Sequence, residues 1–347
     1  MEQKPFFFKI LQKPLGKLSL GFIVLTSFCA IFASFLAPDS SENANQMHVA
    51  IHSKPPGYSA LLLHIPNKNG EIIEEIPITD FYWEKEKLFY QNYGVYKDQI
   101  ESINQTIFPL SMTQKEIEEK FIQERTFFLG TDKFGRDLLS RLILGARISL
   151  SIGFVAVLIS LLVGIIIGGL AGFMGGKVDT FILWLINVVW SIPSLLMVIA
   201  IILALGKGFW QVFIAVGLTM WVEVARLVRG QVISIKTRSF IQAAHGLAYS
   251  PMRIFIYHIF PLLIPSLIVI STSNFASAIL IESGLSFLGI GAQPPVPSWG
   301  GMIKDHFRYI LLGKAYLAII PGMAIMSLVL AFMVLGNELR DALDVKN

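Results

Sequence analysis

Long apolar runs separated by polar turns constrain this chain more than any other feature of its sequence. Six such runs are recognisable among the 347 residues. A helix needs about 20 apolar residues to cross the hydrocarbon core of a bilayer, so each run can cross it once. Charged residues make up 15% of the chain, against about 25% in a typical soluble domain. The sequence therefore predicts an all-α integral membrane protein with six transmembrane helices, at residues 18–37, 148–172, 180–205, 208–229, 262–290 and 315–336.

The basic residues lie mainly at the ends of these runs, where the cytoplasmic loops of membrane proteins collect lysine and arginine. A pI near 9.0 would also suit a nucleic-acid-binding protein, but this placement excludes that class. Four lysines precede the first run and three basic residues follow the fourth, namely Lys4, Lys9, Lys13, Lys17, Lys236, Arg238 and Arg253. They predict a multi-pass protein whose N- and C-termini are both cytoplasmic. Arg136, Arg141 and Arg147 then fall outside, which we accept because long external segments translocate largely regardless of charge.

Composition divides the chain into three parts. Residues 1–37 form a cytoplasmic N-terminus and the first transmembrane helix, residues 38–147 an extracytoplasmic segment, and residues 148–347 the core of the membrane domain. The first apolar run is too long for a cleaved signal sequence and is predicted to be retained. The extracytoplasmic segment is rich in Glu, Lys, Asn and Tyr, and its stretch TQKEIEEKFIQE predicts a short exposed helix. The segment is either a small folded unit or a partly ordered loop.

Two features of the core bear on helix packing. Pro193 should kink the third span and leave the carbonyl of Val189 without its usual partner. Gly164, Gly168 and Gly172 recur every four residues and so share one face of the second span, where another helix can approach closely. This face either packs against a helix of the same subunit or lines a subunit interface or pore.

The stretch SFIQAAHGLAYSPMRIFIYHIFP interrupts the apolar pattern with small, polar and basic residues. Ser239 and Gln242 have the spacing of a capping box, which predicts a helix start. Ser250 and Pro251 predict the start of a second helix, which Pro261 should end. The result is two short helices joined by a sharp bend. A slim tip of this kind fits a socket in a partner protein; the alternative is an interfacial helix lying on the lipid headgroups.

This stretch is similar to the cytoplasmic coupling loop of the permease subunits of binding-protein-dependent ABC importers. The family pattern is Glu-Ala-Ala, a glycine four residues later, and Ile-x-Leu-Pro or similar near the end. In this chain Gln242-Ala243-Ala244 is followed by Ala248, where the glycine would stand, and later by Ile-Phe-Pro. The glutamine keeps the capping geometry but loses a charge. Because the nearest glycine is Gly246, the bend is expected to shift.

The resemblance implies that the cytoplasmic loop 231–261 couples the chain to an ATPase subunit. The residues that it assigns to this contact are Gln242, Ala243, Ala244, Gly246, Ala248, Arg253 and Pro261.

Four more stretches resemble the second permease subunit of the oligopeptide, dipeptide and nickel branch of this family. They are LGTDKFGRDLLSRLILGARISLSIG at 129–153, AGFMGGKVDTFI at 171–182, ILIESGLSFLGIGAQPPVPSWGGMI at 279–303 and LGNELRDALD at 335–344. The resemblance covers most of residues 129–344 and leaves 40–125 unmatched. It implies a bacterial inner-membrane permease that pairs with a second permease, is driven by two cytoplasmic ATPase subunits and receives substrate from an extracytoplasmic binding protein. The implied substrates are di- or oligopeptides, with nickel or another small solute as the alternative.

The loop after the fifth span contains three prolines, which stiffen it by fixing their own backbone dihedrals. A rigid surface of this kind suits contact with the binding protein, and the residues that would form it are Pro294, Pro295, Pro297 and Trp299. The alternative is an interfacial anchor, because tryptophan is enriched at membrane–water boundaries.

Glu282 lies within an apolar run, where a carboxylate is expensive and faces a cavity or a partner. One reading places it on the translocation pore. The other is a buried ion pair with Arg147 or Arg141, at the outer end of the second span. We favour the ion pair, because the fifth span is near its outer end at this point.

The sequence contains no pattern for chemistry of its own. It lacks a G-x-x-x-x-G-K-[ST] loop, so ATP hydrolysis is expected to reside in partner subunits. Its six histidines and single cysteine form no ligand spacing, and no nucleophile–base pair stands out, so we predict no metal, no cofactor and no catalytic residue. A membrane-embedded enzyme would need ionisable residues that converge at one depth. An independent secondary transporter would show an internal repeat and broken helices.

Overall fold

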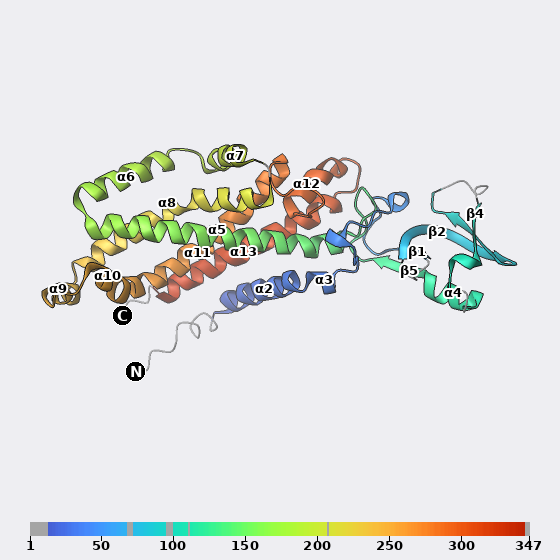
Figure 1. Cartoon of the computed structure of the whole chain (residues 1–347), viewed down its shortest axis with the longest axis horizontal. Coiled ribbons are helices and arrows are strands. Elements are labelled where there is room, and N and C mark those ends of the chain that lie inside the picture. The colour runs from blue at the N-terminus through green and yellow to red at the C-terminus, as the bar shows by residue number, and fades with distance from the viewer. Residues whose placement is uncertain (1–12, 68–71, 95–99, 110–111, 207, 344–347) are drawn as a thin grey trace, which may run out of the picture. The chain divides into compact units, whose positions relative to one another are not determined.

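The computed structural model describes residues 13–67, 72–94, 100–109, 112–206 and 208–343 (Figure 1). The chain divides into two compact units. A helical unit comprises residues 1–31, 145–304 and 321–347, and a sheet unit comprises residues 32–144 and 305–320. Lys4 and Lys9, two of the lysines predicted to hold the N-terminus in the cytoplasm, lie outside the described residues.

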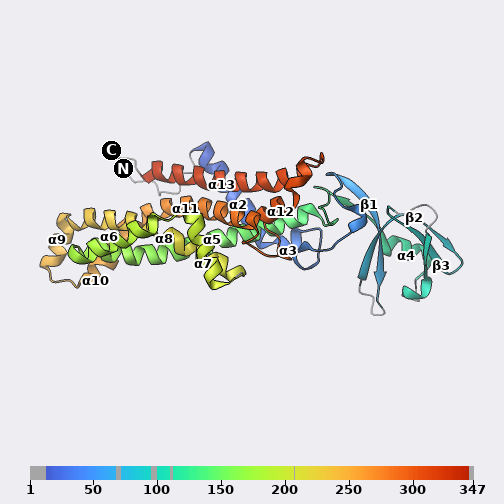
Figure 2. The same cartoon turned by 90° about the horizontal axis from the view of Figure 1, so that it is seen from above.

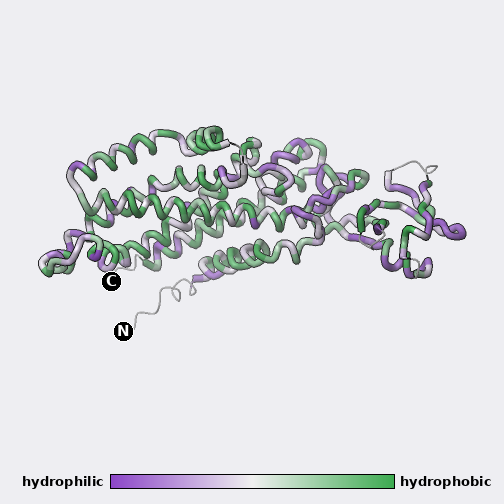
Figure 3. The backbone as a smooth tube through the Cα atoms, in the orientation of Figure 1, coloured by the Kyte–Doolittle hydropathy of each residue, from purple (hydrophilic) through white to green (hydrophobic). Residues whose placement is uncertain are grey.

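The described residues contain five single helices that are long and apolar enough to cross a membrane, and one bent helix pair that meets the same criteria when its two halves are taken together. Apolar residues dominate these helices along their length (Figure 3). Five of the six predicted spans are therefore single helices, and the count reaches six when the bent pair is taken as one span. The five helices are α2 (Pro14–Ile31), α5 (Leu138–Met174), α8 (Phe209–Lys236), α13 (Tyr316–Leu343) and the run Pro251–Leu288, whose main part is α11 (Phe260–Leu288).

The bent pair consists of α6 (Gly176–Trp190) and α7 (Ser194–Leu205), whose axes differ by 91°. Pro193 lies directly before α7, so the predicted kink is present and is large enough to break the helix. The carbonyl of Val189 is not left unpaired, because it accepts a hydrogen bond from the amide of Ile192 at 3.3 Å.

Helix α8 lies at the centre of the helical unit and contacts α6, α7 and α11. Its contact with α5 runs through the glycine face predicted from the sequence. A Cβ on Gly168 would lie 2.3 Å from the carbonyl oxygen of Ala225, and one on Gly164 would lie 2.5 Å from Cβ of Val224. The glycine face therefore serves helix packing within this subunit, which was the plainer of the two readings.

Helix α13 packs along α11, where the rings of Phe275 and Phe332 stack with centroids 4.2 Å apart (Figure 2). The ends of the helical unit also meet. Lys13 Nζ, directly before α2, lies 2.7 Å from Glu338 Oε2 and 3.0 Å from Asp341 Oδ2, near the end of α13. The start of α2 and the end of α13 are therefore at the same end of the bundle.

The sheet unit is built on five antiparallel strands in the order β4-β3-β2-β1-β5. The strands are β1 (Tyr58–Pro66), β2 (Ile72–Glu84), β3 (Lys87–Asn92), β4 (Ile100–Asn104) and β5 (Ile122–Phe127). The predicted short helix is α4 (Gln114–Phe121), which starts with a complete capping box between Thr113 and Glu116. The described part of the unit also contains five shorter helical turns, namely α3 (Ala33–Leu36), η1 (Glu42–Ala44), η2 (Val49–Ile51), η3 (Gln105–Ile107) and η5 (Phe307–Ile310).

The sheet unit has its own buried core. Leu63, Leu88 and Ile117 are fully buried, and they belong to one apolar cluster that joins the sheet to α4. Of the two predicted alternatives, a small folded unit or a partly ordered loop, the structure therefore has the folded unit. Its boundaries differ from the predicted segment 38–147, because residues 305–320 also belong to it. Tyr316 in this second stretch donates a hydrogen bond to the carbonyl of Lys54 at 2.6 Å.

Candidate functional site

The loop between α8 and α11 contains α9 (Ser239–Gly246), α10 (Pro251–Ile254) and a π-helical turn (Phe255–Ile259). The two short helices and the bend between them match the prediction. Pro261, however, does not end the second helix. It lies in the first turn of α11, where proline is tolerated because its missing N–H would have no partner. Helix α10 therefore continues through the π turn into α11 as one span, Pro251–Leu288.

The bend occurs at Ala248, whose φ of +56° lies in the left-handed region. The amide of Tyr249 donates to the carbonyl of Ala244 at 3.2 Å, and that of Ala248 donates to His245 at 3.0 Å. These are the two hydrogen bonds of a Schellman motif. The predicted shift of the bend toward Gly246 is wrong, because Gly246 keeps helical geometry and Ala248 adopts the strained conformation that glycine would take more easily.

The predicted capping box at Ser239 is also wrong. Ser239 is already the first helical residue of α9, and the N-cap position belongs to Arg238, whose side chain makes no capping hydrogen bond. Gln242 instead donates from Nε2 to the carbonyl of Thr237 at 3.4 Å. Ser250 does occupy the N-cap position of α10, before Pro251, but it makes no side-chain cap.

The loop has a buried inner face. Ile241, Ala244 and Ile254 are 0%, 4% and 0% exposed, and they form one apolar cluster with Val228 and Val232 of α8. The prediction that Ala244 sits in a partner's groove is therefore wrong, because its methyl group packs inside this chain.

The opposite side of the loop is exposed and largely apolar, and we call it the outer face. Its members are Phe240, Ala243, Leu247 and Met252. Gln242 and Gly246 are exposed beside them. Arg253 is exposed too, and its guanidinium carbon lies 4.4 Å from the centroid of the Tyr249 ring. The outer face is therefore accessible to another protein.

The loop after α11 presents only part of the predicted proline surface. Pro294 and Pro295 are exposed, whereas Pro297 and Trp299 are buried. Trp299 begins α12 (Trp299–His306) and packs on Gly145, where a Cβ would lie 2.6 Å from its Cδ1. The indole is therefore neither an interfacial anchor nor a docking group, and it holds the loop against α5.

Glu282 is fully buried and organises this same loop. Its Oε1 accepts a hydrogen bond from Ser286 Oγ at 2.6 Å, and Ser286 Oγ accepts one from the amide of Ala292 at 3.1 Å. Within the described part of the chain, Glu282 forms no ion pair with Arg147 or Arg141.

The two arginines named as partners of Glu282 have partners of their own. Arg147 donates to the carbonyl of Ala30 at 3.0 Å. Arg141 donates to the carbonyl of Ala44 at 3.3 Å and lies 3.8 Å from Asp132. The predicted ion pair is therefore not formed, because the arginines bind backbone carbonyls and Asp132, and Glu282 pairs with a hydroxyl group one helical turn away.

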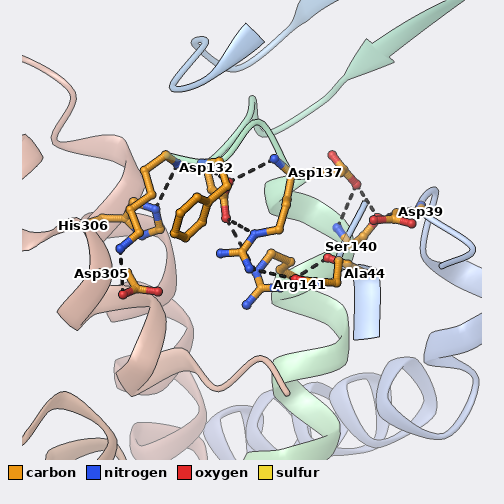
Figure 4. A network of polar contacts seen from close by, with 12 residues as sticks. Asp39, Ala44, Asp132, Asp137, Ser140, Arg141, Asp305 and His306 are labelled. Atoms are coloured by element: carbon orange, nitrogen blue, oxygen red, sulfur yellow. Dashed lines mark hydrogen bonds and ion pairs between the residues drawn. The ribbon is translucent and has the colours of Figure 1, made fainter. Parts of the chain in front are cut away.

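The stretch TDKFGRD before α5 forms a buried polar joint within the sheet unit (Figure 4). Asp132, at its centre, is fully buried and accepts hydrogen bonds from the amide of Phe134 at 2.8 Å and from Arg136 Nε at 2.6 Å. Lys133 extends the joint to the second stretch of the unit through an ion pair of 3.0 Å with Asp305. This motif, which the family resemblance singled out, therefore connects the two stretches of the sheet unit, residues 32–144 and 305–320.

A second polar site, which was not among the residues predicted from the sequence, lies at the break between α6 and α7. A cavity of about 320 Å³ lies there between the helix break, α8 and α11. Its polar and aromatic lining includes Trp190, Ser194, Thr219, Glu223 and Ser277. Glu223 falls within the fourth apolar run, so the rule that selected Glu282 could have selected it too.

These features define a class of protein. The membrane-spanning helices carry a two-helix loop whose inner face packs on α8 and whose outer face is exposed. This is the arrangement expected of a transport permease. A family model matches residues 164–344, and its family is the inner-membrane component of binding-protein-dependent transport systems. The chain belongs to this family.

Curated relatives are 38–41% identical to the chain over 219 aligned residues. A dipeptide transport system permease protein (DppC) of Bacillus subtilis is 41% identical over 219 residues, which are 63% of this chain and 68% of that one. A glutathione transport system permease protein (GsiD) of Pectobacterium atrosepticum is 38% identical over 219 residues, which are 63% of this chain and 72% of that one. An oligopeptide transport system permease protein (OppC) of B. subtilis is also 38% identical over 219 residues, with the same coverage.

A solved structure has the same fold at low identity. It is a chain of the MetNI methionine ABC transporter in an inward-facing conformation, at a TM-score of 0.50 and 18% identity, covering 60% of this chain and 98% of that one. The fold of the helical unit is thus one used by ABC transporter permeases.

Proposed function

We propose that this chain is the permease subunit of an importer of di- or oligopeptides and forms half of its translocation path. A second, similar permease completes the path, two cytoplasmic ATPase subunits drive it, and an extracytoplasmic binding protein delivers the peptide. The substrate rests on the names of the relatives, which transport dipeptides, oligopeptides and glutathione. Nickel or another small solute is the alternative.

The observation that carries the coupling role is the division of the loop into two faces. The outer face, with Ala243 at its centre, meets a groove on an ATPase subunit. The inner face, with Ile241, Ala244 and Ile254, is packed on α8. A force applied to the outer face therefore acts on α8 through well-packed side chains rather than through a hinge.

The helix that runs from Pro251 to Leu288 gives this force a second route. Because α10 continues into α11, a displacement of the loop also moves the span that carries Glu282 and the outer loop. ATP-dependent closure of the partners drives transport only if it favours one state of the path over the other. We infer that these states differ in how α8 and α11 pack against each other.

The orientation in the membrane is part of the proposal. The loop and both termini are cytoplasmic, and the sheet unit is extracytoplasmic. The contacts of Lys13 with Glu338 and Asp341 support this, since they bring the two ends of the chain to one side. The exposed Pro294 and Pro295 then face the binding protein.

Two experiments test this function. Affinity purification of the tagged chain from a mild detergent should recover two ATPase subunits and a second permease. Cells that lack the chain should lose uptake of labelled di- or tripeptides and regain it from a plasmid. Normal peptide uptake with lost nickel uptake would favour the alternative substrate. A tagged chain that purifies alone and still transports would favour an independent transporter, for which the break between α6 and α7 is the structural argument.

A single-cysteine experiment tests the orientation. After Cys29 is replaced, a cysteine at Ser250 should react only with reagents that reach the cytoplasm, and one at Glu119, which is exposed on α4, should react from outside. Reversed labelling would overturn the proposed topology.

A further inference from the structure

Glu223 lies at the middle of a transmembrane span. The span Trp210–Lys236 has thirteen residues on each side of it, or about 20 Å of helix at 1.5 Å per residue. Its side chain is exposed on the surface of the chain. Within the described residues it takes part in no hydrogen bond and no ion pair, in contrast to the buried Glu282, which pairs with Ser286.

Lipid cannot cover this side chain at low free energy. A carboxylate at the centre of a bilayer is expensive, and such residues face a bundle interior or a water-filled cavity. The exposed face of α8 at Glu223 is therefore turned toward the translocation path or toward a partner.

The neighbouring charges on α8 already have partners within this chain. Arg226, one turn further along, donates to Asn187 Oδ1 at 3.1 Å, and its guanidinium carbon lies 3.2 Å from the centroid of the Trp190 ring. Arg229 pairs with Asp179. Glu223 is thus left as a carboxylate that no cation of this chain neutralises, within the part of the chain that the structure describes.

An open cavity lies in front of Glu223. It has a volume of about 320 Å³ and is bordered by hydroxyl groups from three different helices, those of Ser194, Thr219 and Ser277. This volume is within the range of small-molecule sites, roughly 300–1,000 Å³, in which a few polar groups fix the orientation of the ligand. A cavity of this kind fits a passing solute better than a permanent cationic side chain of a partner, for which a close-packed contact is the rule.

We propose that Glu223 binds the protonated amino group of the transported peptide as it passes the middle of the membrane. The proposal rests on the proposed function, since it assumes that the solute is a peptide. A free α-amino group has a pKa of about 7.7–8.0, so most peptides carry this charge at neutral pH. The carboxylate supplies the complementary charge, and the hydroxyl groups around it accept or donate the remaining hydrogen bonds.

The test uses the complete transporter in proteoliposomes, with the same binding protein and ATPases for every variant. Two peptides of one sequence are compared, one with a free amino terminus and one N-acetylated, and their side chains are chosen so that the binding protein loads both. Glu223→Gln should lower uptake of the free-amino peptide by about tenfold or more, as expected for a lost charge-assisted hydrogen bond. Uptake of the acetylated peptide should stay at the wild-type rate. Because the binding protein is the same throughout, this difference reports on the permease alone.

Two further variants sharpen the comparison. Glu223→Asp keeps the charge and should retain the preference for the free amino group. Glu119→Gln makes the same chemical change on the exposed surface of α4, outside the cavity, and should leave both uptake rates unchanged.

Three results would overturn the inference while the proposed function stands. They are an equal loss of uptake for both peptides in Glu223→Gln, no change for either, or a fall in the yield of assembled transporter. The last result would identify Glu223 as an interface residue that pairs with the second permease. If the wild-type transporter takes up neither peptide, the proposed peptide substrate is wrong, and the inference about Glu223 is wrong as well.

Discussion

The hydroxyl group of Ser286 lies 2.6 Å from Oε1 of Glu282, one helical turn away on α11. Oγ of Ser286 in turn accepts a hydrogen bond from the amide of Ala292, so the side chain of Ser286 connects a buried carboxyl group to the backbone of the outer loop. These two hydrogen bonds therefore hold the start of the loop that carries Pro294 and Pro295 in place.

We predict that Ser286→Ala loosens this loop. The substitution removes the hydroxyl group that binds both the buried carboxyl group of Glu282 and the amide of Ala292, and a buried polar group that loses its partner costs about 1–3 kcal/mol. Hydrogen exchange should rise at residues 289–298 and stay unchanged in α8. Ser271→Ala is the matched control, because Ser271 also lies on α11 and donates only to the carbonyl of Leu267 in its own helix. Equal hydrogen exchange at residues 289–298 in the two variants would contradict the role of Ser286 in holding the loop.

A glycine at position 248 should stabilise the coupling loop. Ala248 has a φ of +56°, and an L-residue in the left-handed region costs roughly 1–2 kcal/mol relative to glycine. Ala248→Gly should therefore slow hydrogen exchange across residues 239–250. Gly246→Ala should also be tolerated, because this glycine is helical and nothing lies within 4 Å of its added Cβ. Faster exchange in Ala248→Gly would argue against the bend described here.

The close approach of α5 and α8 should make Gly168 intolerant of any side chain. The added Cβ of Gly168→Ala would lie 2.3 Å from a backbone oxygen, and overpacking of this kind typically costs about 1–3 kcal/mol or more. Gly230→Ala on α8 is the matched control, since nothing lies within 4 Å of its Cβ. Thermal unfolding in detergent should separate the two variants, with only Gly168→Ala lowering the midpoint.

The sheet unit should lose stability as the pH falls below about 6.5. Burial lowers the pKa of His48 below its usual 6.5, despite the nearby carboxylates of Glu75 and Asp39. For Glu75, burial raises the pKa, but hydrogen bonds with His64 and Gln46 and the nearby histidine charges outweigh it and lower the pKa below 4.5. Both folded-state pKa values are depressed, so their stabilisation is present above the unfolded values and is lost as the pH falls through the folded ones.

Hydrogen exchange of the amides of β1 and β2 tests this dependence, with intrinsic rates corrected for pH. Protection should be lower at pH 5.5 than at pH 7.5, and His48→Gln should reduce the difference. His52→Gln, at an exposed position nearby, should retain it. A wild-type protein with equal protection at both pH values would contradict the role of His48.

Hydropathy alone located the membrane spans, because lipid imposes the same requirement on every residue of a span. The sheet unit could not be derived in the same way, because its strands pair residues that are distant in the sequence. Leu61 of β1, for example, lies opposite Ile78 of β2. Its second stretch, around Tyr316, carries no local signal at all.

For single side chains, too, the sequence could not predict which residues are buried by contacts with another helix. Ala243 and Ala244 are indistinguishable in the sequence, yet only Ala244 is buried, because the packing of α9 on α8 decides which methyl group turns inward. The partner of Glu282 could have been predicted, since Ser286 is four residues along the same helix and such pairs face each other. Glu223 carries the same signal as Glu282, an acidic residue within an apolar run, but its cavity is formed by helices that are distant in the sequence.

The most direct test of the coupling role compares tryptophan at these two neighbouring alanines. Ala243→Trp should leave the permease folded and inserted, because this side chain is exposed, but should block the contact with the ATPases. Ala244→Trp should instead reduce the amount of folded protein, because its larger side chain has to enter the cluster with Val228 and Val232. Ala243→Ser, a small change on the outer face, should behave as wild type.

The deciding measurement is ATPase co-purification and peptide uptake for Ala243→Trp, each normalised to the amount of inserted permease. The account predicts normal insertion, loss of most of the bound ATPase and no measurable uptake. Normal recovery of the ATPases together with normal uptake would contradict the assignment of this loop as the coupling site.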